Sequence, residues 1–514
     1  MDDAVTGQLE GLRISRRGLL GGALGIGAAA ALAACGNSSS TTTTTTALSA
    51  MPSLGQLPTE QQMRANIAHM VGFGPRFTGS DAHNAFIDWT VSNLKAAGCS
   101  ILPYDQQTFE RWLADDWSLQ VLDGPARGPV KIASYYPYGG ETPAGGVVGK
   151  LVTPALVAAG NDSTAGNIML IDTNAPADIT QGQLAATLGF EYIDWPNSNW
   201  MSHNYRRMWL ASGKGGNTGG AVAAIYILDG SFAACAGNYA PFGEAYQNFP
   251  ALYVDQATGA ALTSAAAGPP SARLVMTASK KTVSSPSVVA VLEGDGSTDE
   301  VLILNTHSDG PNFAEENGVV ALVMLARYFA GLPKSKRLHR SLVFSAVTGH
   351  FGPALPQTQG FVNDHPDLID RAAAAVTIEH FGSTEWWDDA QGYHATGRPE
   401  IAVVYNAKTS SVENTVIDTI KSHNLLQTGA APAGPEYFGV GGPIQNAGVP
   451  EASFIAGPTY LVSTGMSSPT SPYAGELDKL DPALAARQVA WAADVLTQFD
   501  GMSKSELAGQ VAGA

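Results

Sequence analysis

A single loop, residues 306–318, carries side chains that could bind a cation together. It contains His307 and Asp309, followed by Glu315 and Glu316. An imidazole and three carboxylates can all ligate a divalent metal ion, and a cation is the simplest partner that would satisfy so many acceptors in one loop. The alternative for the glutamate pair is an ordinary acidic first turn, which the dipole of a following helix favours.

The segments that flank this loop place it at the edge of a sheet. Residues 301–304 form an all-apolar run, typical of a strand buried on both faces of a mostly parallel sheet. Residues 319–329 are apolar nearly all round, and Asn317 is placed to cap their first turn, which predicts a helix packed deep against that sheet. Ligands of open α/β sheets bind beyond the carboxyl ends of the strands, so the loop is predicted to lie at the active-site edge.

Two later strand-like segments end in the same way, one followed by His350 and the other by Glu379 and His380. The carboxyl ends of parallel strands meet at one edge of a sheet. We therefore expect His307, His350 and His380 to share a site. The alternative is that each histidine bonds only to backbone groups at the end of its own strand.

The order of these motifs resembles that of the secreted di-zinc aminopeptidases, a family whose relatives include glutamate carboxypeptidase, glutaminyl cyclase and the transferrin receptor. The resemblance starts with Pro-Arg-x-x-Gly-Ser between two predicted helices and continues through the His-x-Asp strand end to a last predicted helix. The matching segments are 72–80, 299–310, 318–327, 340–350, 375–382, 443–450 and 476–499. The resemblance implies an α/β fold with a mostly parallel mixed sheet flanked by helices, from about residue 57 to residue 500.

The resemblance also implies roles for the first loop. In the family, the His and Asp of the first motif are a zinc ligand and its orienting carboxylate, and they correspond to His307 and Asp309. The family's Asp that bridges two zinc ions falls on Ala314. Glu315 or Glu316, each longer by a methylene, would have to take its place.

Other positions depart from the family pattern. Glu379 stands where the family has a later Asp ligand, and it keeps the charge. The family's strand-end Glu-Glu pair, a general base and a zinc ligand, falls on His350 and Phe351, or on Gly349 and His350 if the alignment shifts. No histidine follows His423, so the family's final ligand is absent.

These replacements predict one divalent ion at most, with zinc as the simplest choice and an open ligand position for water. The predicted ligands are His307, Glu315 or Glu316, and Glu379. His350 could replace the glutamate as general base, because the unperturbed imidazole pKa of about 6.5 suits proton transfer at neutral pH. Alternatively, His350 or His380 supplies a fourth ligand and makes the site structural.

Two functions are compatible with this site. The first is an aminopeptidase-type metallohydrolase acting on peptide or small amide substrates, in which Asp309 is a catalytic-site residue. The second is a non-catalytic binding protein, as the transferrin receptor is within this fold. The polar constellation favours the first, because unpaired buried charge is costly. Trp386 and Trp387 follow the Glu379 strand and are predicted to rim the crevice, although packing explains them equally well.

The catalytic-like sequence is interrupted. Residues 57–130 and 285–503 carry the aminopeptidase-like segments, and residues 504–514 form a tail. Between them, residues 131–284 are rich in Gly, Ala and short strand-like runs and resemble a protease-associated domain, which implies a role in shaping access to the site or mediating contacts. The aromatic-rich segment 191–209 within it is interpreted as local packing of a long loop, with a substrate wall or membrane-contacting patch as the alternative.

The amino terminus predicts an exported lipoprotein. Arg16 and Arg17 precede an apolar Gly/Ala-rich run, as in a twin-arginine export signal, and Leu-Ala-Ala-Cys ending at Cys35 has the form of a lipoprotein cleavage box. A transmembrane helix is the weaker interpretation, because the run is short. Residues 1–35 are therefore the predicted signal, with Cys35 lipidated, and residues 36–56 a low-complexity tether. The predicted location is the bacterial cell envelope, on the outer face of the cytoplasmic membrane.

Charge and cysteine content add two constraints. The net charge is −17 and the longest basic stretch is 334–340, which excludes nucleic acid as an expected partner. Cys99 and Cys235 could form a disulfide or remain two buried thiols. The oligomeric state is not indicated. His365 is expected to be exposed, and the remaining histidines to be solvated or locally bonded: His69, His83, His203, His339, His394 and His423.

Overall fold

The computed structural model describes residues 51–173, 189–193, 219–434 and 438–509. The predicted signal with Cys35, most of the tether and most of the aromatic segment 191–209 lie outside the described residues. The end of the predicted tether contacts the domain: the N–H of Gly55 donates to the carbonyl of Arg327 at 3.1 Å. In the predicted tail, residues Lys504–Leu507 form a short helix, α16.

The central sheet has the strand order β16, β15, β17, β12, β10, β11, β9. These strands are β9 (Ser271–Leu292), β10 (Val301–His307), β11 (Ser341–Val347), β12 (Ala372–Ile378), β15 (Ala402–Asn406), β16 (Thr428–Pro432) and β17 (Glu451–Ala456). Strands β17, β12, β10 and β11 run parallel, whereas β15 is antiparallel to β17 and β9 is antiparallel to β11. The predicted mostly parallel mixed sheet is confirmed.

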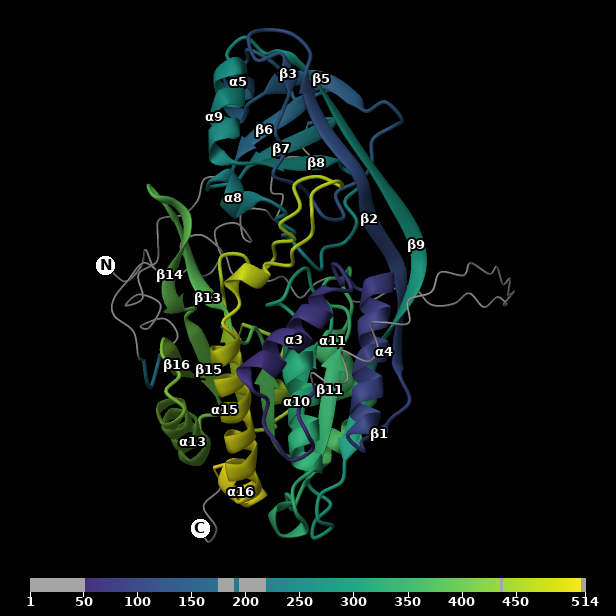
Figure 1. The fold of residues 1–514 in the computed structure, drawn as a ribbon. Helices are drawn as coiled ribbons and strands as arrows, with labels where there is room; N and C mark the ends of the chain where they lie inside the picture. Colours follow the sequence, from purple (N-terminus) through teal and green to yellow (C-terminus); the bar gives the residue numbers. More distant parts are fainter. Residues whose placement is uncertain (1–50, 174–188, 194–218, 435–437, 510–514) are drawn as a thin grey trace, which may run out of the picture. The chain divides into compact units, whose positions relative to one another are not determined.

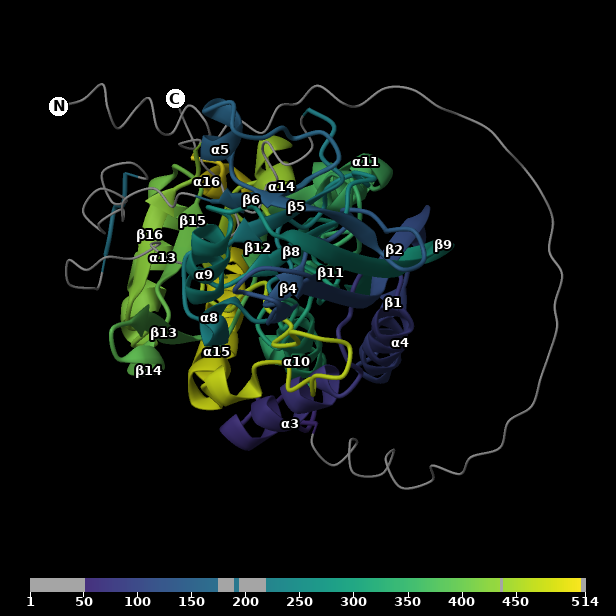
Figure 2. The ribbon, with the colours of Figure 1, turned by 90° about the horizontal axis from the view of Figure 1, so that it is seen from above.

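Helices cover both faces of this sheet. All seven residues of β10 are buried; Leu302 and Leu304 pack with one group of helices, and Val301 and Ile303 with another. The first group is α3 (Glu60–Val71), α4 (Asp81–Ala96), α10 (Gly318–Ala330), α13 (Ser410–Ser422) and α15 (Pro482–Asp500). The second is α11 (Gln357–Asp364), α12 (Pro366–Arg371) and α14 (Gly442–Asn446). Figure 2 shows α10 and α11 on opposite sides of β11. Burial on both faces explains why β10 reads as a continuous apolar run.

Helix α10 begins where the backbone comes very close to the sheet. A Cβ at Gly318 would overlap the side chain of Thr306 and the carbonyl of Ile378, so glycine lets the helix start directly against β10 and β12. Asn317 is at the predicted N-cap position, but its side chain makes no cap bond. It instead accepts from the N–H of Phe381 at 2.9 Å and donates to the carbonyl of Phe381 at 2.6 Å, which joins the loop to the chain after β12.

A long antiparallel ribbon leads from the central sheet to a second group of strands. Strand β2 (Asp105–Val121) pairs with β9 along its length (Figure 1). The second group contains β4 (Ser134–Tyr135), β5 (Val147–Val152), β6 (Ile168–Asp172), β7 (Ala223–Ile227) and β8 (Ala251–Val254), with α5 (Pro154–Ala158), α8 (Phe232–Cys235) and α9 (Gln256–Ala265). Strands β5 to β8 are parallel neighbours, and β5 pairs with the start of β9. These elements lie within the predicted insertion 131–284, whose assignment as a protease-associated domain stays a prediction.

The remaining described elements are short. They are β1 (Ser100–Ile101), β3 (Gly128–Pro129), the hairpin β13 (Thr384–Asp389) and β14 (Gly392–Pro399), and the 3-10 turns Lys334–Lys336 and Leu477–Lys479. Among the described residues, no helix combines the length and apolar character needed to cross a bilayer. Cys99 and Cys235 are both buried and are not joined by a disulfide, and burial raises the pKa of Cys99 to about 12.

Candidate metal centre

Three histidines and two glutamates meet beyond the ends of β10, β11 and β12. His307 ends β10, His350 follows β11 by three residues, and Glu379 and His380 directly follow β12. Glu315 comes from the loop before α10. Ligand atoms of His307, Glu315 and His350 lie within 4.8 Å of one another, as do those of His307, Glu379 and His380. The structure thus brings together the three histidines that the sequence predicts to share a site.

The hydrogen bonds of His307 and His380 fix which ring nitrogen carries the proton. Nδ1 of His307 lies 2.9 Å from the carbonyl oxygen of Asp309, and Nδ1 of His380 lies 2.5 Å from that of Ala456. A carbonyl can only accept, so each Nδ1 must donate, and each Nε2 of the neutral ring carries a lone pair. Backbone carbonyls orient metal-binding imidazoles in this way.

The two carboxylates face these Nε2 atoms. Oxygens of Glu315 lie 3.4 Å from Nε2 of His350 and 3.3 Å from Nε2 of His380. An oxygen of Glu379 lies 3.7 Å from Nε2 of His307, and its other oxygen accepts from the N–H of Val440 at 2.9 Å. Two ligands bound tetrahedrally to one zinc ion at about 2.0–2.1 Å are separated by roughly 3.3 Å, so these spacings fit a metal site.

Several of these atoms have no hydrogen-bond partner within the described part of the chain. They are Nε2 of His307, Nε2 of His380 and Oε2 of Glu315, and all three are buried. Leaving a buried polar atom without a hydrogen bond costs free energy. A nitrogen lone pair that faces a carboxylate oxygen forms no hydrogen bond with it, because both atoms are acceptors. A cation bound by His307, Glu379 and His380 would satisfy both imidazole nitrogens, so the residues present fit a divalent metal.

The electrostatics of the cluster keep the buried imidazole in the form a metal requires. Burial lowers the pKa of His307 well below its ordinary value, and the neighbouring His350 and His380 lower it further. His307 is therefore neutral at neutral pH. Burial raises the pKa of Glu379, against the opposing influence of His380. A cation nearby would reverse this effect and favour the carboxylate.

His350 differs from the other two histidines. Its side chain is 16% exposed, compared with 0% for His307 and 2% for His380. Its Nδ1 lies 2.9 Å from the amide oxygen of Gln357. Burial alone lowers the pKa of His350, but the hydrogen bond and charge of Glu315, assisted by Asp309 and Gln357, outweigh that effect and raise the pKa to about 9.

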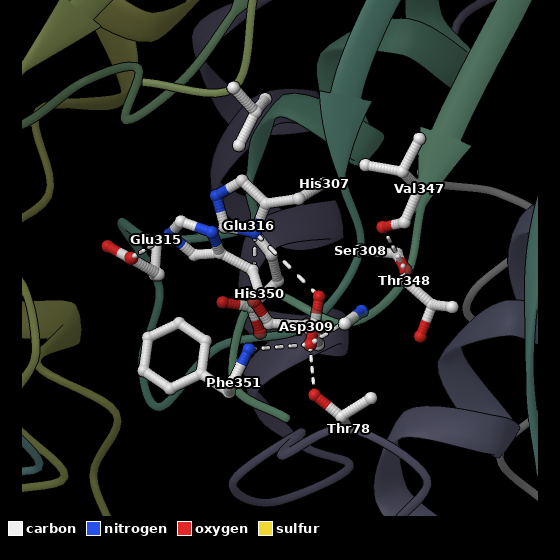
Figure 3. Close-up of polar contacts among 12 residues, drawn as sticks. Thr78, His307, Ser308, Asp309, Glu315, Glu316, Val347, Thr348, His350 and Phe351 are labelled. Atoms are coloured by element: carbon white, nitrogen blue, oxygen red, sulfur yellow. Dashed lines mark hydrogen bonds and ion pairs between the residues drawn. The ribbon is translucent and has the colours of Figure 1, made fainter. Parts of the chain in front are cut away.

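Asp309 holds the loop that carries His350. One of its oxygens accepts from the hydroxyl of Thr78 and from the N–H groups of Gly349 and Phe351, at 3.2 Å and 2.9 Å for the latter two (Figure 3). Its other oxygen lies 4.0 Å from Nδ1 of His307, beyond hydrogen-bond distance. The carbonyl of Asp309 therefore orients His307, whereas its carboxylate orients the two peptides beside His350.

Glu316 is engaged elsewhere. Its carboxylate forms an ion pair with Arg76, and both side chains are fully buried. Arg76 also donates to the carbonyl of Asn312 at 2.6 Å. Burial raises the pKa of Glu316 to about 8, against the effect of Arg76. Of the two glutamates that the sequence offers as a metal ligand, the structure leaves Glu315 facing the histidines and pairs Glu316 with Arg76.

Sequence reasoning missed several residues that support this centre. Arg76 and Thr78 lie in the Pro-Arg-x-x-Gly-Ser segment, so that motif was the available signal for both. Asn312 and Gln357 gave no signal, because a lone amide side chain is compatible with any loop. Their roles depend on which chain segments the fold brings against them.

His83 also departs from expectation. The sequence predicts a solvated or locally bonded side chain, but His83 is fully buried. The N–H of Gly79 donates to its Nδ1 at 3.2 Å, so Nε2 carries the hydrogen and lies 3.0 Å from the hydroxyl of Ser308. Burial lowers the pKa of His83 to about 4. His365, expected to be exposed, is 13% exposed and lies 2.8 Å from a carboxylate oxygen of Asp105.

The two tryptophans predicted to rim the crevice pack against cations. The ammonium nitrogen of Lys479 lies 4.5 Å from the ring centre of Trp386, and the guanidinium of Arg398 lies 5.5 Å from that of Trp387. Both indoles are half-buried in strand β13. These contacts are those of local packing. A role at the substrate rim stays a prediction.

The sequence matches no protein-family model and no curated protein sequence. Solved structures do resemble it. An M28 peptidase precursor from Shewanella amazonensis SB2B aligns with a TM-score of 0.57 at 17% identity, over 86% of this chain and 96% of that one. The chain has the zinc aminopeptidase fold. A zinc aminopeptidase from Bacillus subtilis aligns with a TM-score of 0.53 at 15% identity, over 86% and 95% of the two chains. An aminopeptidase from Aneurinibacillus sp. strain AM-1 aligns with a TM-score of 0.52 at 17% identity, over 86% of this chain and 93% of that one.

Proposed function

We propose that this protein is a zinc-dependent hydrolase that cleaves peptide or small amide bonds. The observation that carries the proposal is the pair of buried imidazoles, His307 and His380, which donate from Nδ1 to backbone carbonyls and whose Nε2 atoms face the carboxylates of Glu379 and Glu315. The likeness to solved zinc aminopeptidases supports the choice of metal and of reaction class.

We infer a single ion. Both groups of ligand atoms include His307. Nδ1 of His307 donates to the Asp309 carbonyl, so only the one lone pair on Nε2 can bind metal, and it can serve one ion at a time. The donor set of one ion would then be drawn from His307, Glu315, Glu379 and His380, with room for water or substrate.

Zinc held there would supply Lewis acidity toward the substrate carbonyl and lower the pKa of a water molecule. The chain supplies the proton handling. His350 is the most exposed of the three histidines, and its Nε2 faces Glu315 at 3.4 Å, so the neutral form of the ring is placed to accept a proton at Nε2 and deliver it to the leaving amine. Asp309 keeps the His350 loop in place through the N–H groups of Gly349 and Phe351.

We further propose that the inserted segment shapes access to the site. The ring of Phe242 lies 4.9 Å from the ring of His350, and Phe242 is half-buried. The carbonyl of Gly243 accepts from the N–H of Ala354 at 3.1 Å. These contacts place a residue from within 131–284 directly beside the proposed general base, which supports the access role implied for a protease-associated domain.

The export signal at residues 1–35 and the lipidation of Cys35 are likewise part of the proposal. They would place the hydrolase on the outer face of the cytoplasmic membrane, held by a lipid anchor and acting on peptides of the cell envelope. The twin arginines and the Leu-Ala-Ala-Cys box support this location. Metabolic labelling with a palmitate analogue tests it: wild type is expected to be labelled and Cys35→Ser unlabelled.

Metal analysis and hydrolysis together test the function. Protein purified without chelator and reconstituted with zinc is expected to hold about one equivalent and to cleave members of a panel of aminoacyl 4-nitroanilides and short peptides. His307→Ala should lose both properties, whereas His394→Ala, on the hairpin β13–β14, should lose neither. Zinc without turnover on any substrate would favour a non-catalytic binding protein. A folded wild type that takes up no zinc would overturn the proposal.

A further inference from the structure

Both the nitrogen and the oxygen of the Asn312 side-chain amide form hydrogen bonds, and they join residues 308–317, here called the metal loop, to another segment. It is fully buried in the loop between β10 and α10. Its amide nitrogen lies 2.9 Å, 2.8 Å and 2.9 Å from the carbonyl oxygens of Tyr460, Leu461 and Ser463. Its amide oxygen accepts from the N–H of Ala314 at 2.8 Å and of Glu315 at 3.4 Å. One side chain therefore sets the peptides on both sides of Ala314 against the chain that follows β17.

This placement matters because of what Glu315 lacks. Oε2 of Glu315 has no hydrogen-bond partner among the described residues, and its carboxylate faces His350 and His380 at 3.4 Å and 3.3 Å. With no hydrogen bond to hold Oε2, the position of the carboxylate depends strongly on the backbone from which the side chain extends. A shift of the Glu315 peptide would carry the carboxylate out from between the two imidazoles.

The other end of the loop is anchored by other side chains, and Arg76 contacts both ends because it also donates to the carbonyl of Asn312. Glu316 pairs with Arg76, and Asn317 bonds both backbone groups of Phe381, the residue after His380. The loop is therefore held at both ends, with Glu315 between the anchors. Asn312 is the anchor that acts on the peptide of Glu315 itself.

We propose that Asn312 is a positioning residue of the metal centre, which fixes Glu315 between His350 and His380. This inference rests on the proposed zinc-dependent function. Asn312 also links the centre to the insertion, because residues 460–463, to which it donates, lie in a segment that is hydrogen-bonded to the insertion. The N–H of Tyr239 donates to the carbonyl of Val462, and the N–H of Thr464 donates to the carbonyl of Gly237, both at 2.9 Å.

Zinc affinity, measured by competition with a chromophoric chelator, separates this role from a contribution to the fold. Asn312→Ala is expected to weaken zinc binding about 10- to 100-fold, as removal of an outer-shell partner does. The matched control is Asn66→Ala, which removes another buried amide, one that donates to the carbonyl of Gln62 within α3 at 2.8 Å. In EDTA, both variants should unfold at similar temperatures, and only Asn312→Ala should lose zinc affinity.

A second comparison tests whether Asn312 acts through Glu315. In a Glu315→Gln background, Asn312→Ala should weaken zinc binding less than threefold further, because the group it positions has already been changed. If Asn312→Ala binds zinc as tightly as the control Asn66→Ala, the inference is overturned, while the proposed metal centre is unaffected. If Asn312→Ala does not fold, Asn312→Ser replaces it. Failure of both to fold in EDTA would assign Asn312 to the fold and also overturn the inference. Wild type that binds no zinc would instead refute the proposed function.

Discussion

At the scale of single residues, the three histidines differ in the group that their Nδ1 atom contacts. Backbone carbonyls accept from Nδ1 of His307 and of His380, so Nε2 is the nitrogen of each ring that faces the carboxylates. His350 instead contacts the Gln357 side chain and is partly exposed. A rigid, dry imidazole suits a metal ligand, and a more accessible one suits proton transfer.

The variant His350→Ala tests this division of roles. Zinc content is expected to stay near that of wild type, because His307, His380 and the two carboxylates remain. Turnover is expected to fall about 10²- to 10⁴-fold, the usual contribution of a general acid or base. Elemental analysis and initial rates on the same preparation measure both. Loss of zinc would make His350 a ligand, and a rate within threefold of wild type would remove it from the mechanism.

The pH dependence of zinc binding follows from the same residue. In the metal-free protein the pKa of His350 is raised to about 9, so at neutral pH the ring is charged and shares its proton with Glu315. Zinc bound to Glu315 would offset the charge that holds this proton and would lower the pKa of His350, so affinity should rise with pH up to about 9 and level off above it. Chelator competition at several pH values measures the slope. The zinc affinity of His350→Gln should rise less steeply with pH over this range. A slope identical to that of wild type would show that the released proton comes from another group.

At the scale of elements, the site depends on loops that follow the strands as much as on the strands themselves. Gly439 shows this most directly. It has a φ of +96°, and a Cβ there would overlap Oε1 of Glu379, the oxygen that accepts from Val440. The chain after residue 438 thus sets the rotation of the Glu379 carboxylate and leaves Oε2 to face His307.

Gly439→Ala is therefore expected to weaken zinc binding by about tenfold or more, because the added methyl group displaces Glu379. Gly448→Ala is the matched control: its φ is +89°, and a Cβ there meets nothing within 4 Å. Both variants impose the same backbone strain. Chelator competition measures the zinc affinity of both variants. Equal affinity of Gly439→Ala and Gly448→Ala would mean that the backbone at Gly439 does not set the position of the Glu379 carboxylate.

At the scale of the whole molecule, a buried ion pair ties the amino-terminal helices to the metal loop. Arg76 lies between α3 and α4, and its partner Glu316 precedes α10, 240 residues further along the chain. Arg76 also donates to the carbonyl of Met70 at 3.2 Å. The pair thus closes a long loop in the chain next to the site.

Breaking this pair from one side should destabilise the protein strongly. Arg76→Met leaves the Glu316 carboxyl buried without its partner, which costs about 3–5 kcal/mol of unfolding free energy. Adding Glu316→Gln should restore at least half of that loss, because the buried carboxyl left without a partner is replaced by an amide that carries no charge at any pH. Denaturant unfolding in EDTA measures both variants without a contribution from metal. A double variant no more stable than Arg76→Met would show that the charge itself is not the cause.

Much of the architecture could be predicted from the sequence because it depends on local patterns. The apolar run before His307 predicts a strand buried on both faces, and such strands belong to parallel sheets covered by helices. Parallel strands share a carboxyl-terminal edge, so His307, His350 and His380 were predictable as neighbours before any coordinates. The signal sequence and the insertion are predictions of the same kind, made from composition and motif.

Only the tertiary structure decided which carboxylate serves the site and what holds it. Glu315 and Glu316 are adjacent and chemically identical, and the choice between them depends on Arg76, which reaches Glu316 from a distant segment. The tautomers of His307 and His380 likewise depend on carbonyls that the fold brings to Nδ1. Residue type and spacing determined that a metal centre could form at this edge. Contacts between segments far apart in the chain determined which side chains face one another there, because hydrogen bonds and charge act over a few ångströms of space regardless of sequence separation.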